Sequence, residues 1–267
     1  MDKILSCMAC SNFCVKWRAV GLLGALITSG CSEQRRIDPP KTAAEMEAAR
    51  QGREILAAMA QRYRNFDRYA CRIAVRTEDV HSGRSSFVET GNTQVEFRRG
   101  QRLRVWGSFP SLTVPGPDYD MICDQQGCRW RSSKYGDGPW EQLENIAHAI
   151  STLRHTSRAS LLLCTLLCDL RWGTKPKDYL LGTVEEAMAS TISLVRWDGE
   201  PENSICVLKA MCDKMEVEMH VRYKDLVLVL VKETLPASAG KGSRLVLRPP
   251  PDSAYVGTFE FHDIAWR

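Results

Sequence analysis

The stretch Met215-Glu216-Val217-Glu218-Met219-His220-Val221-Arg222-Tyr223 decides the fold, because apolar and polar side chains alternate along it without a break. Successive side chains of a β-strand point to opposite faces of its sheet, so strict alternation indicates a strand with one buried and one solvated face. Strands of this kind are typical of antiparallel sheets. The stretch therefore predicts a domain that is built around an antiparallel sheet.

Strand-like segments recur on both sides of this stretch. A run of four residues, Asp124 to Gly127, separates two of them and is typical of a hairpin loop. Before Met215, the predicted strands are Tyr69–Val75, Phe87–Thr90, Thr93–Phe97, Leu103–Phe109, Met121–Cys123, Cys128–Trp130 and Ile192–Trp197. After Tyr223, they are Leu226–Val231, Arg244–Leu247 and Thr258–Trp266.

Two segments have helical rather than strand periodicity. Residues 43–64 place Met46, Ala49, Ile55, Leu56, Met59 and Tyr63 near one stripe, as in an amphipathic helix. Residues 141–169 return to helical spacing, and Ser160 to Leu170 is so apolar that it predicts a buried helix. The order of helix, strands, helical insertion and strands predicts an α+β fold: a large curved antiparallel sheet, a half-barrel whose concave face the insertion covers.

The first thirty residues have the three parts of an export signal. Lys3, Lys16 and Arg18 precede the apolar run Ala19–Ile27, and small residues follow it. The run is too short to cross about 30 Å of hydrocarbon as a helix. We expect a signal peptide at 1–30, a tether at 31–42 with Pro39-Pro40, and one domain at 43–267.

Ile27-Thr28-Ser29-Gly30-Cys31 resembles the bacterial lipobox, which predicts cleavage before Cys31 and lipid on its thiol. Two or three acyl chains anchor a protein stably in a membrane. By resemblance to proteobacterial sorting rules, Ser32 after the modified cysteine favours the outer membrane, with the domain facing the periplasm. An unprocessed signal anchor and an ordinary cleaved signal are the alternatives.

The element order resembles the lipoprotein-carrier superfamily typified by LolA and LolB. Three segments support the resemblance: Ile55 to Met59 leading through Tyr63, Phe66 and Tyr69 into a strand; Gln94 to Gly100 leading to Leu103-Arg104-Val105; and the closing Phe259 to Ile264. It covers about residues 50–267 and implies a LolA/LolB-like half-barrel that shields an acyl chain or another apolar ligand without catalysis.

The alternating strands supply candidate lining residues for such a site, and the apolar helix supplies a lid. Each buried acyl CH₂ contributes about 0.8 kcal/mol, and methionine suits an adaptable surface. The alternative is that these side chains are simply core. The candidates are Val95, Phe97, Leu103, Val105, Met215, Val217, Met219 and Val221 in the sheet, with Leu162, Leu163, Leu166 and Leu167 in the lid.

Seven of the eleven cysteines lie beyond the signal and the lipid site. Cys123 and Cys128 flank the predicted hairpin turn, so we expect a disulfide between them. Cys206 and Cys212 are a second candidate pair if the chain bends between them. Cys164 and Cys168, four apart on a helix, fit buried free thiols better. The spacings do not match paired zinc ligands, and we expect no metal and no cofactor.

Composition and motifs narrow the function classes. A net charge of +4 with scattered arginines does not favour nucleic-acid binding, which needs a clustered basic face. No nucleophile elbow, zinc-protease, Walker or dinucleotide motif is present, so no enzyme activity is expected. The sequence predicts a lipid-anchored envelope protein that binds a lipid, a lipoprotein or another hydrophobic ligand. The alternatives are a non-catalytic interaction or stress-sensing module on the same fold and an envelope hydrolase; the oligomeric state is open.

Overall fold

The computed structural model describes residues 42–111, 118–133, 138–153, 158–169, 188, 190–200, 203–212, 215–236 and 253–267. The predicted signal peptide, Cys31 and the tether up to residue 41 lie outside this part of the chain. The strand predicted at Arg244–Leu247 lies outside it as well. No helix among the described residues has the length and apolar content needed to cross a bilayer.

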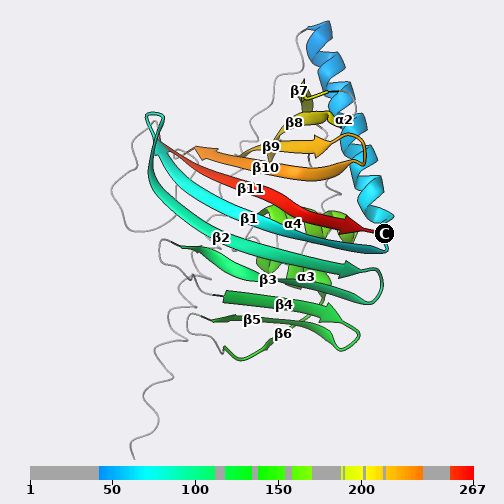
Figure 1. The fold of residues 1–267 in the computed structure, drawn as a ribbon, viewed down its shortest axis with the longest axis vertical. Helices are drawn as coiled ribbons and strands as arrows, with labels where there is room; N and C mark the ends of the chain where they lie inside the picture. The colour runs from blue at the N-terminus through cyan, green and yellow to red at the C-terminus, as the bar shows by residue number, and fades with distance from the viewer. Residues whose placement is uncertain are drawn as a thin grey trace, which may run out of the picture. The chain divides into compact units, whose positions relative to one another are not determined.

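The described residues form one sheet of eleven strands, in the order β6-β5-β4-β3-β2-β1-β11-β10-β9-β8-β7 (Figure 1). All neighbouring strands pair antiparallel. The strands are β1 Arg68–His81, β2 Arg84–Arg98, β3 Arg102–Ser111, β4 Asp118–Asp124, β5 Gly127–Ser133, β6 Glu141–Leu143, β7 Ser193–Asp198, β8 Ile205–Cys212, β9 Met215–Arg222, β10 Val227–Pro236 and β11 Ser253–Trp266.

The sheet consists of two meanders that the last strand joins. Strands β1 to β6 follow one another across one half, and β7 to β10 do so across the other. β11 lies between β1 and β10 and pairs with both, for example Val75 with Phe259 and Phe259 with Val231. The sheet is curved and unclosed, with β6 and β7 at its two edges (Figure 1). The predicted fold class, a curved antiparallel sheet covered by helices, is confirmed.

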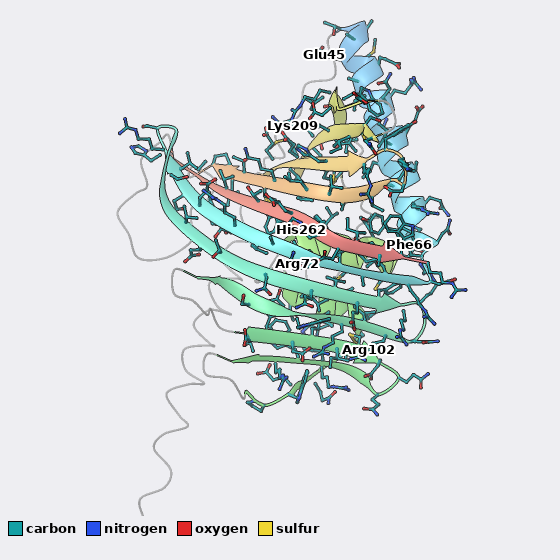
Figure 2. The ribbon with its side chains drawn as sticks, in the orientation of Figure 1. Glu45, Phe66, Arg72, Arg102, Lys209 and His262 are labelled. Carbon is teal, nitrogen blue, oxygen red and sulfur yellow. A yellow bond between two sulfur atoms is a disulfide. The ribbon has the colours of Figure 1, made fainter. Side chains whose placement is uncertain are left out.

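The two faces of the sheet differ in chemistry, as the alternation predicted. One face, here called the helix face, carries the buried apolar side chains, and Cys71, Ile73 and Val75 of β1 belong to it. The other, here called the open face, carries charged residues such as Arg72 of β1 and Arg102 of β3, both labelled in Figure 2. In β9, Met215, Val217, Met219 and Val221 are buried and the residues between them are only partly covered.

Helix α2 spans Ala43–Arg64, the range that the sequence predicted. Thr42 and Glu45 form a capping box at its start, in which each side chain bonds to the other residue's backbone N–H. The helix packs against β7 and α4. Gly52 permits close contact with β7, because a Cβ there would stand 2.8 Å from Ser193 backbone atoms. Met46, predicted on the buried stripe, is instead 55% exposed.

Helices α3 (Ile146–Thr152) and α4 (Arg158–Leu167) lie behind the sheet in Figure 1. α3 contacts β4, β5 and β6, whereas α4 contacts β2, α2 and α3. Asn145 caps α3 by accepting a hydrogen bond from the His148 N–H at 2.9 Å. The insertion between the two meanders therefore covers the helix face, as predicted.

Three predicted boundaries in the first meander are wrong. Phe87–Thr90 and Thr93–Phe97 belong to the single strand β2, because Gly91-Asn92 marks an irregularity in its pairing with β3 and not a turn. The β4–β5 loop is two residues shorter than predicted, since Asp124 pairs with Gly127, whose φ of 106° suits glycine. Leu143, assigned to a helix, lies in the short edge strand β6.

Strand β8 was not predicted. Its sequence, Ile205 to Cys212, is nearly all apolar and lacks alternation, and a bend there entered only as the condition for a second disulfide. Both faces of β8 are buried in part, since Cys206, Val207 and Leu208 are all inaccessible. A continuous apolar run is the pattern of a strand that is covered on both sides, which periodicity alone does not distinguish from other structures.

Candidate functional site

The twelve residues predicted to line or cover an apolar site, all buried, belong to one cluster. Eight come from two separate parts of the sheet, β2–β3 and β9, and four come from α4. In the structure they share the core between the helix face and the helices. They are Val95, Phe97, Leu103, Val105, Leu162, Leu163, Leu166, Leu167, Met215, Val217, Met219 and Val221.

Helix α4 forms the cover of this cluster. Ala159, Leu163, Cys164 and Leu167 are inaccessible, and Leu162 and Leu166 are nearly so. A ten-residue helix that buries so many leucines contributes about 1.5–3 kcal/mol for each fully buried side chain. These contacts are non-directional, so α4 is held over the sheet mainly by apolar area.

The interior between the sheet and the helices combines methionines with a small number of polar side chains. Met59, Met121 and Met219 are all inaccessible. Methionine has an unbranched, polarisable side chain that adapts to irregular neighbours. The Thr93 and Tyr119 hydroxyls hydrogen-bond to each other at 2.5 Å, which satisfies both in a buried position.

An aromatic cluster fixes the end of α2 on the sheet. The Tyr63 and Phe66 rings meet edge to face at 5.3 Å, and Tyr69 of β1 lies 5.5 Å from Tyr63. The Tyr63 hydroxyl accepts a hydrogen bond from the Leu228 N–H at 3.1 Å. The pairing of β10 with β9 is irregular at this point, between Leu228 and Leu230. The Tyr63 hydroxyl thus supplies an acceptor for the Leu228 N–H at a bulge in β10.

One ion pair connects the C-terminal end of α4 to α2. Arg64, the last residue of α2, donates to Asp169 at 2.5 Å, just beyond α4. Asp169 has a φ of 51°, the left-handed conformation that often ends a helix. Because Asp169 is largely exposed, the pair contributes at most about 1 kcal/mol.

The cysteines divide into one bridge and several buried thiols. Cys123 and Cys128 face each other across β4 and β5 and form a disulfide. Cys206 is a free thiol, so the alternative bridge to Cys212 is wrong, because the two lie on one extended strand. Burial raises the pKa of Cys71 to about 12 and that of Cys168 to about 12, which keeps both thiols protonated and unreactive at neutral pH.

The histidines of the described residues are dispersed over four elements, β1, α3, β9 and β11. His148 lies in α3, where its buried Nδ1 makes no hydrogen bond to the described residues. His262 lies on the open face of β11, 3.4 Å from Glu260, while Asp263 pairs with Arg72. His155 lies outside the described residues. Within the described part of the chain, no group of three or more His, Cys, Asp or Glu side chains is placed to hold a metal ion.

The sequence did not predict a cleft of about 320 Å³ on the open face. Its walls come from β2, β3, β4 and β5, and its side chains include Arg104, Trp106 and Asp120. Arg104 and Trp106 alternate with the buried residues of β3, whereas Asp120 lies in β4, which does not alternate, just before the predicted strand Met121–Cys123. Only the register between the four strands brings them together.

Comparison with solved structures returns matches of low sequence identity. A DUF1329 family protein from Desulfovibrio piger is 10% identical, with a TM-score of 0.33, over 82% of this chain and 93% of that one. A putative outer membrane lipoprotein-sorting protein domain from Vibrio parahaemolyticus is 7% identical, with a TM-score of 0.35 and the same coverage. A LolA superfamily protein from Nitrosomonas europaea is 10% identical, with a TM-score of 0.30, over 81% and 93%.

No family model matches the sequence, and no curated protein matches it. TM-scores this low carry no inference about ligand or activity. The function must rest on the residues of this chain.

Proposed function

We propose that the protein is a lipid-anchored, non-enzymatic lipoprotein of the cell envelope that binds a lipid or another hydrophobic molecule between helix α4 and the sheet. One observation supports this above others. The predicted lining residues from β2, β3 and β9 belong to one apolar cluster, which also holds the leucines of α4, and α4 packs on β2.

The contacts beneath α4 are of a kind that an acyl chain can replace. Leucine and methionine side chains touch the sheet through apolar area alone, so a methylene chain in their place loses little. Each acyl CH₂ that leaves water contributes about 0.8 kcal/mol, and a long chain therefore offsets the displacement of a short helix. Binding begins when α4 moves away from β2 and ends when it closes over the ligand.

The proposed anchor keeps this domain close to a membrane. Cys31 precedes Ala43, the first residue of α2, by twelve positions. At about 3.3–3.6 Å per extended residue, the domain stays within about 40 Å of the bilayer. Two or three acyl chains on Cys31 make this attachment stable. With Ser32 next to the lipid site, the outer membrane, on its periplasmic side, is the proposed location.

Mass spectrometry of the mature protein, purified from membranes, tests the anchor. We expect an N-terminus at Cys31 with the mass of its acyl groups, and we expect Cys31→Ser to release the protein from the membrane fraction. A soluble mature protein that retains residues 1–30 would contradict the anchor, and would leave ligand binding to be judged separately.

Uptake of a dansyl-labelled fatty acid tests the site beneath α4. We expect a blue-shifted fluorescence on binding, and faster uptake in Asp169→Asn, because that change removes the ion pair to Arg64 at the end of the cover. The expected gain is up to about fivefold, the rate equivalent of about 1 kcal/mol. Asparagine tolerates the positive φ at this position, so the backbone is preserved.

Asp263→Asn is the matched control. Asp263 also has a positive φ, 53°, and also pairs with an arginine, Arg72, but it lies on the open face away from α4. This variant should take up the probe at the wild-type rate. If wild-type protein binds no probe, or if both variants accelerate uptake equally, the site beneath α4 is refuted.

A second candidate function, an interaction module, rests on a different surface. Trp197 at the end of β7 is 46% exposed and Tyr223 after β9 is 50% exposed, and their rings meet edge to face at 5.0 Å. Exposed aromatic residues of this kind are typical anchors of protein interfaces. A stable partner that is captured by wild-type protein and lost with Trp197→Ala, together with no binding of the fatty-acid probe, would favour this function.

A further inference from the structure

The cleft on the open face has a chemistry different from that of the interior. It occupies about 320 Å³, at the lower end of the volumes that small-molecule sites have in proteins. Gln94 of β2, Arg104 and Trp106 of β3, Asp118 and Asp120 of β4, and Arg131 of β5 contribute to its walls. Pairing places Gln94 beside Trp106, Trp106 beside Asp120, and Asp120 beside Arg131.

The floor of the cleft is a buried carboxylate between two arginines. The Asp120 side chain is 8% exposed and accepts hydrogen bonds from Arg104 Nε at 3.1 Å and Arg104 Nη2 at 3.0 Å. Arg131 Nη2 donates to the same carboxylate at 3.4 Å. Each guanidinium has five N–H donors, so both arginines retain donors for a ligand after these bonds are made.

Tryptophan rings hold the two guanidinium groups in place. The Arg104 guanidinium carbon lies 4.6 Å from the centre of the Trp106 ring, and that of Arg131 lies 4.6 Å from the centre of the Trp140 ring. Cation–π contact and the bidentate bond to Asp120 together limit the motion of Arg104. The donors of the cleft are therefore ordered before any ligand arrives, which lowers the entropic cost of binding.

The rim adds two polar side chains that make no hydrogen bond within the described residues. The exposed side chains of Gln94 and Asp118 make no hydrogen bonds to the rest of the described structure. Gln94 provides a donor and an acceptor, and Asp118 provides acceptors. The two arginines and the two aspartates cancel in charge, so the cleft as a whole is neutral.

This combination selects a class of ligand. A phosphate or carboxylate would meet as many like charges as opposite ones, which removes most of its electrostatic gain. A polyhydroxylated ring needs both donors and acceptors, because each hydroxyl is both, and it presents an apolar C–H face that can lie against the half-buried Trp106. We infer that this cleft binds a neutral saccharide, through Arg104, Arg131, Gln94 and Asp118, with Trp106 as its apolar wall.

Isothermal titration calorimetry with chitotriose, maltotriose and inorganic phosphate tests the inference. At least one of the two neutral trisaccharides should bind with a dissociation constant in the millimolar range or below, and phosphate should not. Trp106→Ala should weaken that binding at least about tenfold, as truncation of an aromatic anchor commonly does. Gln94→Leu removes an exposed polar group without a packing role and should weaken it as well, which separates loss of the site from loss of the fold.

Trp197→Ala is the matched control, because it removes an equally large ring from β7, outside the cleft. It should bind the trisaccharide as tightly as wild type does. The inference is overturned if neither trisaccharide binds, if phosphate binds in their place, or if Trp197→Ala weakens binding as much as Trp106→Ala. None of these results depends on whether a hydrophobic ligand enters beneath α4.

Discussion

Two buried tyrosines show how single polar atoms contribute to this fold. The Tyr63 hydroxyl bonds to the Leu228 N–H, whereas the Tyr69 hydroxyl, also buried, makes no hydrogen bond to the described residues. Both are nearly inaccessible. A buried donor that loses its partner costs about 1–3 kcal/mol, while removal of an unpaired hydroxyl costs little or is favourable.

We predict that Tyr63→Phe lowers the free energy of unfolding by about 1–3 kcal/mol, because the Leu228 N–H is left buried without an acceptor. Tyr69→Phe should leave it unchanged or raise it. Urea denaturation followed by circular dichroism measures both. Equal losses of unfolding free energy in the two variants would show that the hydrogen bond from the Leu228 N–H does not stabilise the fold.

The buried thiols predict loss of stability at high pH. Burial raises the pKa of Cys71 from 9.0 to about 12. The folded protein therefore keeps this proton between about pH 9 and pH 12, while the unfolded chain releases it, so the free energy of unfolding falls as pH rises through this window. The slope approaches about 1.4 kcal/mol per pH unit for each such group.

Urea denaturation at about pH 8 and about pH 10.5 measures this slope. Cys71→Ala is expected to be less stable at both values because it leaves a small cavity, but its stability should fall less steeply with pH. If the free energy of unfolding of Cys71→Ala falls as steeply with pH as that of the wild type, the pKa of Cys71 does not differ between the folded and unfolded states.

At the scale of elements, the contact between α2 and β7 depends on the absence of one side chain. A Cβ at Gly52 would stand 2.8 Å from the Ser193 Cα and carbonyl carbon, both of which are backbone atoms that cannot rotate away. Alanine is favoured over glycine within a helix by about 1 kcal/mol, so propensity alone predicts that Gly52→Ala stabilises α2.

We predict the opposite sign, a loss of about 1–3 kcal/mol in Gly52→Ala, because overpacking against β7 exceeds the gain in helix propensity. Arg53→Ala, at the exposed neighbouring position, should change stability by less than about 0.5 kcal/mol. Thermal unfolding of both variants tests this, and a stabilised Gly52→Ala would mean that α2 shifts away from β7 at little cost.

The elements that sequence reasoning recovered are those whose pattern is local and clean. α2 was predicted at its observed bounds, and β9 within one residue, because helical spacing and alternation are visible in neighbouring residues. β8 and β6 were missed for different reasons. β8 is apolar on both faces and so has no period of two, whereas β6 has three residues and is a strand only because β5 lies beside it.

At the scale of the whole molecule, the two candidate sites differ in how far the sequence could indicate them. The residues of the interior could be predicted from the sequence, because alternation places Val95, Leu103 and Met219 on buried faces whichever strands become neighbours. The open-face cleft was not foreseeable. Gln94 and Arg131 meet there only through the register of three successive strand pairs, which is a property of pairing and not of any one strand.

Strand β11 makes the two meanders one folding unit. It is the last strand in the chain, yet it pairs with β1 in the middle of the sheet, and Phe259 and Phe261 bury their rings on the helix face. Without it, β1 and β10 would each present a long, apolar edge of unpaired backbone groups, which is a template for aggregation. We therefore predict that a chain of residues 39–252, which lacks β11, aggregates and loses the single cooperative unfolding transition of the parent chain, residues 39–267. The control is Val195→Asp in the parent chain, which adds a charge at an exposed position of the edge strand β7. It should keep both the transition and the solubility. Calorimetry measures the unfolding transition of the three chains, and size-exclusion chromatography measures their aggregation. A soluble truncated chain with one sharp transition would mean that the helices, and not β11, hold the meander β1 to β6 and the meander β7 to β10 together.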